Sequence, residues 1–158
     1  PIGSGKTISQ PFIAAVMTDL LDIQATDTIL EIGRGLGYHA DVLAELAAVV
    51  YSVEIVPELG EIAREKLAAL GYRNVHARVG DGAGGWPEHA PFDKILVAAA
   101  PMAIPDFLLQ QLEPGGRMVI PVGPETAQEL VVVEKDDNNI REARNVFPVR
   151  FAALETRH

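Results

Sequence analysis

Three glycines at alternate positions, Gly33, Gly35 and Gly37, follow an apolar run that ends at Glu31 and Ile32. Alternate glycines let the backbone turn through positive φ and let a ligand lie against bare main chain. The alanine- and leucine-rich stretch that follows predicts a helix, whose first turn offers unpaired N–H groups and the positive end of a dipole. The stretch therefore predicts a binding site for a polar, partly anionic small molecule.

Two carboxylates follow the glycine turn at positions that suit a nucleoside. Glu54 ends the second predicted strand, where it can accept both hydroxyls of a ribose through charge-assisted hydrogen bonds. A solvated side chain at a strand end is the alternative. Asp81 stands between two glycines after the third predicted strand, where it can bind an adenine amino group or cap the following turn. Joined to the glycine turn, the two acids predict a ribose-bearing cofactor.

Other catalytic patterns are incomplete. Tyr38 stands where the dinucleotide motif G-x-G-x-x-G requires its third glycine, so a nicotinamide oxidoreductase is a distant alternative. Gly5-Lys6-Thr7 matches the end of a phosphate-binding loop, but the earlier glycine and the leading strand of that motif are not in the sequence. The chain has no cysteine, and none of its four histidines is paired at metal-ligand spacing. We therefore predict no metal site and no thiolate catalysis.

The composition limits the class of partner. The chain has 158 residues, 48% of them apolar, which is enough for one domain with a hydrophobic core. Its formal charge of −9 repels nucleic-acid phosphates, so we expect no nucleic-acid substrate. No apolar run is long enough to cross a bilayer. The absence of cysteine suits a reducing cytoplasm, and we expect a cytoplasmic monomer.

Strand and helix patterns alternate through the first two-thirds of the sequence. This alternation predicts a doubly wound α/β domain, with a parallel sheet, helices on both faces and antiparallel strands at one edge. Ligands in such sheets bind at the carboxyl ends of the strands. Helices are expected from Ser9 to Leu21, at 38–47, from Pro57 to about Leu70 and at 105–112, and strands at 28–32, 49–53, 75–79, 94–97, 118–122, 129–135, 140–147 and 149–154, with a turn at 114–116.

Motifs spread over the chain resemble those of the protein-L-isoaspartate O-methyltransferase family. The most specific are Thr-Ile-Ser-Gln-Pro at 7–11 and Gly-Asp-Gly with Gly-Trp-Pro at 80–87. They are joined by Glu-Ile-Gly-x-Gly-x-Gly-Tyr at 31–38, Tyr-Ser-Val-Glu at 51–54, Ala-Pro-Phe-Asp at 90–93 and Gly-Gly-Arg to Pro-Val-Gly at 115–123. The similarity runs from Pro1 to about Leu154, and the family's N-terminal segment has no counterpart in the sequence.

The resemblance implies a single methyltransferase domain over residues 1–158, with a Rossmann-like, mostly parallel seven-stranded sheet and S-adenosyl-L-methionine as cofactor. It implies methyl transfer to the α-carboxylate of L-isoaspartyl residues in damaged proteins, whose ester then cyclises to a succinimide. Ser9 takes the place of the family's active-site serine, and Ser9 and Gln128 are expected to bind substrate. The expected cofactor-binding residues are Thr7, Ile8, Glu31, Gly33, Gly35, Gly37, Glu54, Ile55, Asp81 and Gly82.

The chemistry implied by the resemblance needs no strong base. A carboxylate has a pKa of about 4 and is already a nucleophile at neutral pH. In-line positioning and exclusion of water would supply catalysis, with Ser9 orienting the carboxylate or capping its helix. Arg34 and Leu36 replace the small residues usual between the glycines. Two alternatives stay open: a cofactor-binding domain with impaired catalysis, and a methyltransferase of the same fold that acts on another carboxylate or a small molecule.

Overall fold

The computed structural model describes residues 10–33, 38–139 and 141–154. Among these residues, no helix is both long and apolar enough to cross a membrane. The elements are α1 (Gln10–Leu21), β1 (Thr28–Gly33), α2 (Tyr38–Leu46), β2 (Val49–Glu54), α3 (Pro57–Ala69), β3 (Val75–Val79), the 3₁₀ helix η2 (Pro87–His89), β4 (Phe92–Val97), α4 (Asp106–Gln111), β5 (Leu112–Val122), β6 (Gln128–Lys135) and β7 (Arg141–Val149).

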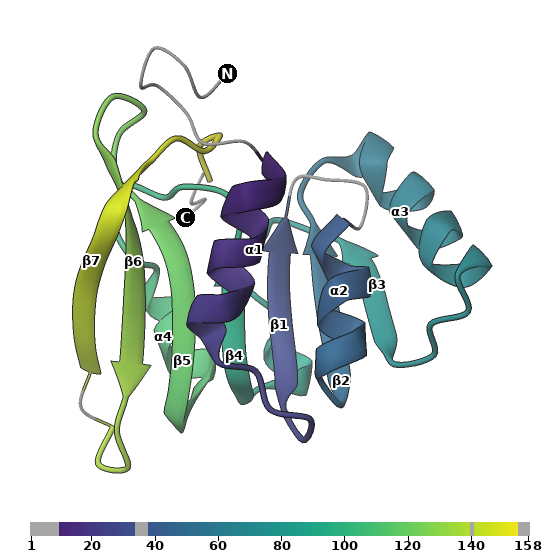
Figure 1. Cartoon of the computed structure of the whole chain (residues 1–158), viewed down its shortest axis with the longest axis horizontal. Coiled ribbons are helices and arrows are strands. Elements are labelled where there is room, and N and C mark those ends of the chain that lie inside the picture. The colour runs from purple at the N-terminus through teal and green to yellow at the C-terminus, as the bar shows by residue number, and fades with distance from the viewer. Residues whose placement is uncertain (1–9, 34–37, 140, 155–158) are drawn as a thin grey trace.

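The seven strands form one sheet in the order β3-β2-β1-β4-β5-β6-β7. The pairs within β3-β2-β1-β4-β5 are parallel, whereas β6 runs antiparallel to both β5 and β7. In Figure 1 the arrowhead of β1 points to the top edge of the sheet and that of β6 points to the bottom. The strand order steps outward in both directions from β1, which makes the sheet doubly wound. The predicted fold class, with antiparallel pairing at one edge, is confirmed.

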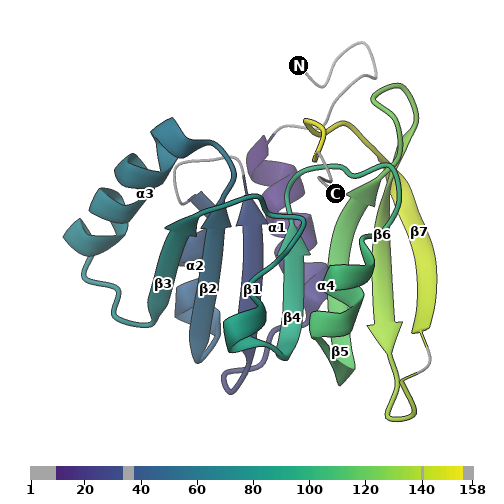
Figure 2. The ribbon, with the colours of Figure 1, turned by 180° about the vertical axis from the view of Figure 1, so that it is seen from behind.

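Helices cover the two faces unequally. Figure 1 shows α1 and α2 in front of the sheet, and Figure 2, from behind, shows α4 on the opposite face. Helix α3 packs against the β3 edge through Gly60, where a Cβ atom would collide with the side chain of Val79. Since Val79 pairs with Glu54 at the end of β2, this close approach fixes α3 beside the carboxyl end of that strand.

Two apolar layers, one on each face, hold the sheet together. On the α1 and α2 face, Met17 and Leu43 pack with strand residues such as Ile29. On the α4 face, Leu108 and Ile95 belong to the second layer. Strands β1 and β4 contribute side chains to both layers, so they are buried on both faces, as expected for central parallel strands.

A buried ion pair closes the lower edge of the sheet. Lys94 Nζ lies 2.7 Å from Asp27 Oδ2 and also donates to the carbonyl of Asp22. Asp27 Oδ2 accepts a further hydrogen bond from the backbone N–H of Gln24. The pair therefore ties β4 to the connection that leads from α1 into β1, at the end of the sheet opposite the carboxyl ends of these strands.

The structure differs from the sequence-based expectation around β5. A turn was predicted at 114–116, but the strand runs through these residues from Leu112. Phe92 pairs with Leu112 and Lys94 pairs with Arg117. Between these two pairs the chain moves on by five residues in β5 but by only two in β4. The Pro-Gly-Gly sequence thus forms a bulge within the strand. The short strand expected at 149–154 is reduced to a single bridge between Ala100 and Ala153.

Candidate functional site

The carboxyl ends of β1 and β2 lie side by side. Gly33, the last residue of β1, pairs with Glu54, the last residue of β2. The N–H of Ile55 donates to the carbonyl of Gly33 at 3.0 Å, and the N–H of Gly80 donates to the carbonyl of Glu54 at 3.0 Å. The segments that leave β1, β2 and β3 therefore start from one edge, as predicted from the positions of the glycine turn, Glu54 and Asp81.

Glu31 is buried just before this edge. It is 5% exposed, and its Oε1 accepts a hydrogen bond of 2.6 Å from the hydroxyl of Ser52, the residue opposite it on β2. A carboxylate buried to this extent requires hydrogen-bond partners. Its other oxygen, Oε2, lies 3.5 Å from the position that a Cβ atom would take on Gly33. Glu31 thus stands directly beneath the end of β1.

Glu54 is not the solvated strand-end residue of the alternative interpretation. It is 8% exposed, and its Oε2 accepts a hydrogen bond of 3.0 Å from the N–H of Val56. Val56 precedes the first turn of α3, so the carboxylate sits at the positive end of this helix dipole. The structure therefore holds an acid in one orientation at the carboxyl end of β2.

Asp81 and Gly82 follow β3 in a tight turn. Asp81 is exposed, and its Oδ1 accepts a hydrogen bond of 3.1 Å from the N–H of Ala83. Gly82 has a φ of +78° and is buried, and a Cβ atom there would lie 2.6 Å from Ile55 Cγ2 and 2.9 Å from Ile32 Cγ2. The turn therefore requires glycine at this position and lies against the ends of β1 and β2. The capping role considered for Asp81 is present and leaves its second carboxylate oxygen for other contacts.

The remaining predicted site residues do not all lie at this edge. Ile55 follows Glu54 and packs against Gly82, so it belongs to the same edge. Gln128 is 3% exposed, and its amide pairs with both backbone groups of Phe151, at 2.9 Å to the carbonyl and 2.6 Å from the N–H. This pairing anchors the C-terminal segment to β6. The expected residues Thr7, Ile8, Ser9, Gly35 and Gly37 lie outside the residues that the structure describes.

An aromatic stack on the α4 face was not predicted. Tyr51 lies parallel to both His76 and His89, with centroid distances of 5.0 and 4.3 Å, and it meets Trp86 edge-on at 5.4 Å. Arg78 covers the Trp86 ring at 4.4 Å. These residues hold the segment after β3 against the sheet. No group of three potential metal ligands occurs within the described ranges.

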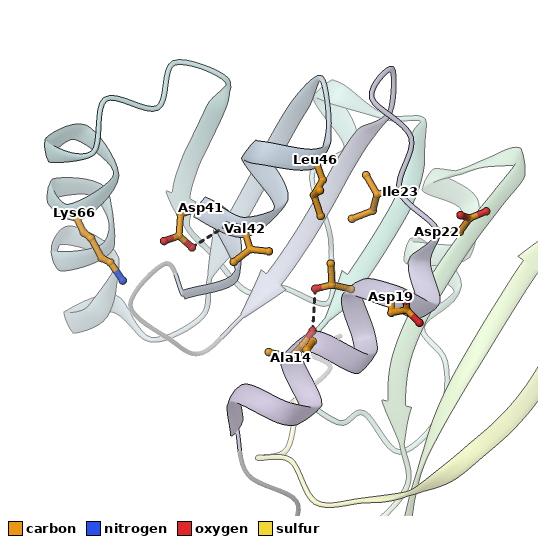
Figure 3. Close-up of a pocket in the computed structure, with 10 residues that line it drawn as sticks. Ala14, Asp19, Asp22, Ile23, Asp41, Val42, Leu46 and Lys66 are labelled. Carbon is orange, nitrogen blue, oxygen red and sulfur yellow. Dashed lines mark hydrogen bonds between the residues drawn. The ribbon is translucent and has the colours of Figure 1, made fainter.

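A groove of about 650 Å³ lies elsewhere, between α1 and α2 on the opposite face from the aromatic stack (Figure 3). Its lining combines apolar side chains, such as Ala14 and Val42, with charged ones, such as Asp19, Asp41 and Lys66 of α3. The lining comes from helices and from the connection after α1, and not from the strand ends. The groove is therefore separate from the edge where Glu54 and Asp81 gather.

Structural comparison identifies the fold, with this strand order, as that of S-adenosylmethionine-dependent methyltransferases. The model of the protein-L-isoaspartate(D-aspartate) O-methyltransferase family matches residues 1–158. The chain belongs to this family, as the sequence motifs predicted.

Individual relatives agree with this assignment. Protein-L-isoaspartate O-methyltransferase 1 of Polaromonas sp. strain JS666 is 59% identical over 150 residues, which are 95% of this chain and 64% of that protein. A solved protein-L-isoaspartate O-methyltransferase matches 94% of this chain and 48% of its own, with 30% identity and a TM-score of 0.85. A second solved structure of this kind, from Plasmodium falciparum in complex with S-adenosyl-L-homocysteine, matches 98% of this chain and 78% of its own. It has 22% identity and a TM-score of 0.73. The chain thus spans less than two thirds of the curated relative.

The described residues fit an adenosyl ligand. Its ribose presents hydroxyl donors, which suit the oriented carboxylate of Glu54. Its adenine presents an amino donor, which suits the exposed Asp81. The glycine at position 82 keeps the backbone close to Ile32 and Ile55, where a side chain would push the turn away from the ends of β1 and β2.

Proposed function

We propose that this chain is an S-adenosylmethionine-dependent methyltransferase that esterifies the α-carboxylate of L-isoaspartyl residues in damaged proteins. The observation that carries the proposal is the pairing of Gly33 with Glu54 in a chain that matches the family model over its whole length. The names of the relatives support methyl transfer to isoaspartyl residues, and the S-adenosyl-L-homocysteine of the Plasmodium structure supports the cofactor class.

Each residue of the edge has a defined task in this proposal. Glu54 accepts the ribose hydroxyls, Asp81 accepts the adenine amino group, and Glu31 supports the end of β1 from beneath. When bound, the cofactor supplies a methyl group activated by a positively charged sulfur. The protein needs only to orient the incoming carboxylate in line with that methyl group and to exclude water, effects that together can be worth roughly 7–11 kcal/mol.

Ser9 is proposed to bind the substrate directly, and Gln128, whose buried amide is bonded to Phe151, to contribute by holding the C-terminal segment in place. A serine hydroxyl can donate a hydrogen bond to the isoaspartyl carboxylate and fix its direction of attack. Replacing Ser9 with alanine is therefore expected to lower kcat strongly while the affinity for S-adenosyl-L-homocysteine stays within about twofold. An equal loss of turnover and cofactor affinity would contradict an orienting role for this residue.

The family and the charge together indicate the partners. We infer protein and peptide substrates from the family. We infer no nucleic acid, because the formal charge of −9 repels phosphates. We also expect a monomer that works in the cytoplasm and does not bind membranes. Sedimentation at several protein concentrations checks the monomer, which predicts a mass near 17.0 kDa.

Transfer of a radiolabelled methyl group to an isoaspartyl peptide tests the proposal, with the matching aspartyl peptide as control. Transfer to the isoaspartyl peptide alone is the expected result. Binding of S-adenosyl-L-homocysteine without transfer to either peptide would point to a domain with impaired catalysis or to a methyltransferase with another acceptor. The absence of binding would reject the methyltransferase proposal itself.

A further inference from the structure

We propose that Gln111 is a positioning residue that holds the turn carrying Asp81 in place for adenine recognition. The proposal rests on the function proposed above. Gln111 is the last residue of α4, on the face of the sheet away from α1 and α2 (Figure 2). Gln111 is distant from Asp81 in the sequence, and it is not part of the family motifs named above.

The amide of Gln111 uses both of its ends on one loop. Its Oε1 accepts a hydrogen bond of 2.9 Å from the N–H of Trp86, and its Nε2 donates a hydrogen bond of 2.9 Å to the carbonyl of Gly84. The residue is 6% exposed. Gly85, between the two contacts, has a φ of +63°, and a Cβ atom on it would collide with the Gln111 amide. The loop and the glutamine are therefore closely fitted.

A second side chain binds the adjacent group of the loop. Arg78 Nη2 donates a hydrogen bond of 2.8 Å to the carbonyl of Gly85, and the Arg78 guanidinium stacks on Trp86. Together with Gln111, it holds the carbonyls of Gly84 and Gly85 and the N–H of Trp86. Three consecutive residues of the loop are thus fixed by one side chain from α4 and one from β3.

Backbone hydrogen bonds connect the residues held by Gln111 and Arg78 to Asp81. The N–H of Gly85 donates to the carbonyl of Gly82 at 2.9 Å, and the N–H of Ala83 donates to the carbonyl of Asp81 at 2.8 Å. The Asp81 carboxylate accepts from the same Ala83 N–H. Two successive turns therefore connect the anchored end of the loop to the acid, and a shift of Gly84 would displace the Asp81 carboxylate.

This arrangement predicts a loss of base discrimination when Gln111 is replaced. Inosine carries a carbonyl acceptor where adenine carries its amino group, so it has no donor at the position that faces Asp81. The wild-type chain is expected to bind S-adenosylhomocysteine about tenfold more tightly than S-inosylhomocysteine, the effect of one hydrogen bond to a charged acceptor. In Gln111→Leu this ratio should fall towards one, because the adenosyl ligand loses affinity and the inosyl ligand does not.

Three variants serve as controls, each measured by calorimetry with both ligands. Gln110→Leu changes the exposed neighbour on the same helix and should keep the wild-type ratio. Asp81→Asn should lose discrimination by itself, and adding Gln111→Leu to it should change the ratio no further. Arg78→Met removes the second anchor of the loop. It should also lower the ratio, and it keeps the test valid if Gln111→Leu does not fold.

The outcomes separate this inference from the function on which it rests. A wild-type chain that binds neither ligand overturns the proposed function and this inference together. A wild-type preference for the adenosyl ligand that survives in both Gln111→Leu and Arg78→Met overturns the positioning role alone. An equal loss of affinity for both ligands also overturns it, because general destabilisation of the site would have that effect.

Discussion

The hydroxyl of Ser52 donates a hydrogen bond of 2.6 Å to the carboxylate of Glu31, and both side chains are buried between adjacent strands. Replacing Ser52 with alanine removes a donor from a carboxylate that water reaches poorly. We expect the free energy of unfolding to fall by about 1–3 kcal/mol, as measured by urea denaturation at neutral pH.

A Ser52→Thr variant keeps the hydroxyl and is the matched control for this prediction. It should lose less stability than Ser52→Ala, since the donor is retained. Equal stability of wild type and Ser52→Ala would show that the hydrogen bond makes no net contribution, and Glu31 would then need another explanation for its burial.

Glu54 is expected to contribute to ligand binding through its charge. Glu54→Gln keeps the shape of the side chain, but the amide is a weaker acceptor for ribose hydroxyls. The affinity for S-adenosyl-L-homocysteine should fall roughly 10- to 100-fold, which calorimetry measures directly. Glu58→Gln, an exposed change in the first turn of α3, is the control and should bind as the wild type does.

Alanine substitutions at two glycines of the same loop are expected to differ in their effect on stability. Gly82→Ala places a methyl group 2.6 Å from Ile55 Cγ2 at a φ of +78°, so it should destabilise the fold by about 1–3 kcal/mol and weaken cofactor binding. Gly84→Ala adds its methyl group to open space, with no atom beyond its own chain neighbours within 4 Å of it. It should change the free energy of unfolding by less than about 1 kcal/mol. Similar losses in the two variants would contradict the close packing at Gly82.

The ion pair of Lys94 and Asp27 stabilises the opposite edge of the sheet. Lys94→Met leaves a carboxylate whose side chain is 10% exposed without its cation, and a loss of about 3–5 kcal/mol is expected. Asp27→Asn should also destabilise, whereas the double variant should lose less than the sum of the two. Additive losses in denaturant titrations would show that the two charges do not interact.

The sequence was sufficient to predict the sheet and the gathering of Glu54 and the Asp81 turn at one edge of it. Apolar strands alternate with amphipathic helices, and this pattern located β1 to β4 within two residues of their observed bounds, whereas β5 begins six residues earlier than expected. The position of Glu54 followed from the rule that ligands gather at strand carboxyl ends. The sequence-based prediction was wrong at Pro114-Gly115-Gly116. These turn-forming residues lie in a bulge of β5, because β4 pairs with β5 on both sides of the bulge.

The contacts that support the site could not be predicted from sequence patterns. Gln111 and Trp86 are distant in the chain, and only the folded sheet brings the α4 end to the loop after β3. Ser52 lies in a motif of the family, but its bond to Glu31 depends on the register of β1 against β2. The structure packs Trp86 against Tyr51 of β2 and Arg78 of β3, contacts that depend on how these two strands pair.

A crystal structure of the chain with S-adenosyl-L-homocysteine tests most directly the claim that the strand ends form the cofactor site. We expect the ribose hydroxyls within hydrogen-bond distance of the Glu54 carboxylate and the adenine amino group beside Asp81. A ligand bound in the groove between α1 and α2 of Figure 3, or one that leaves both carboxylates without contact, would contradict it.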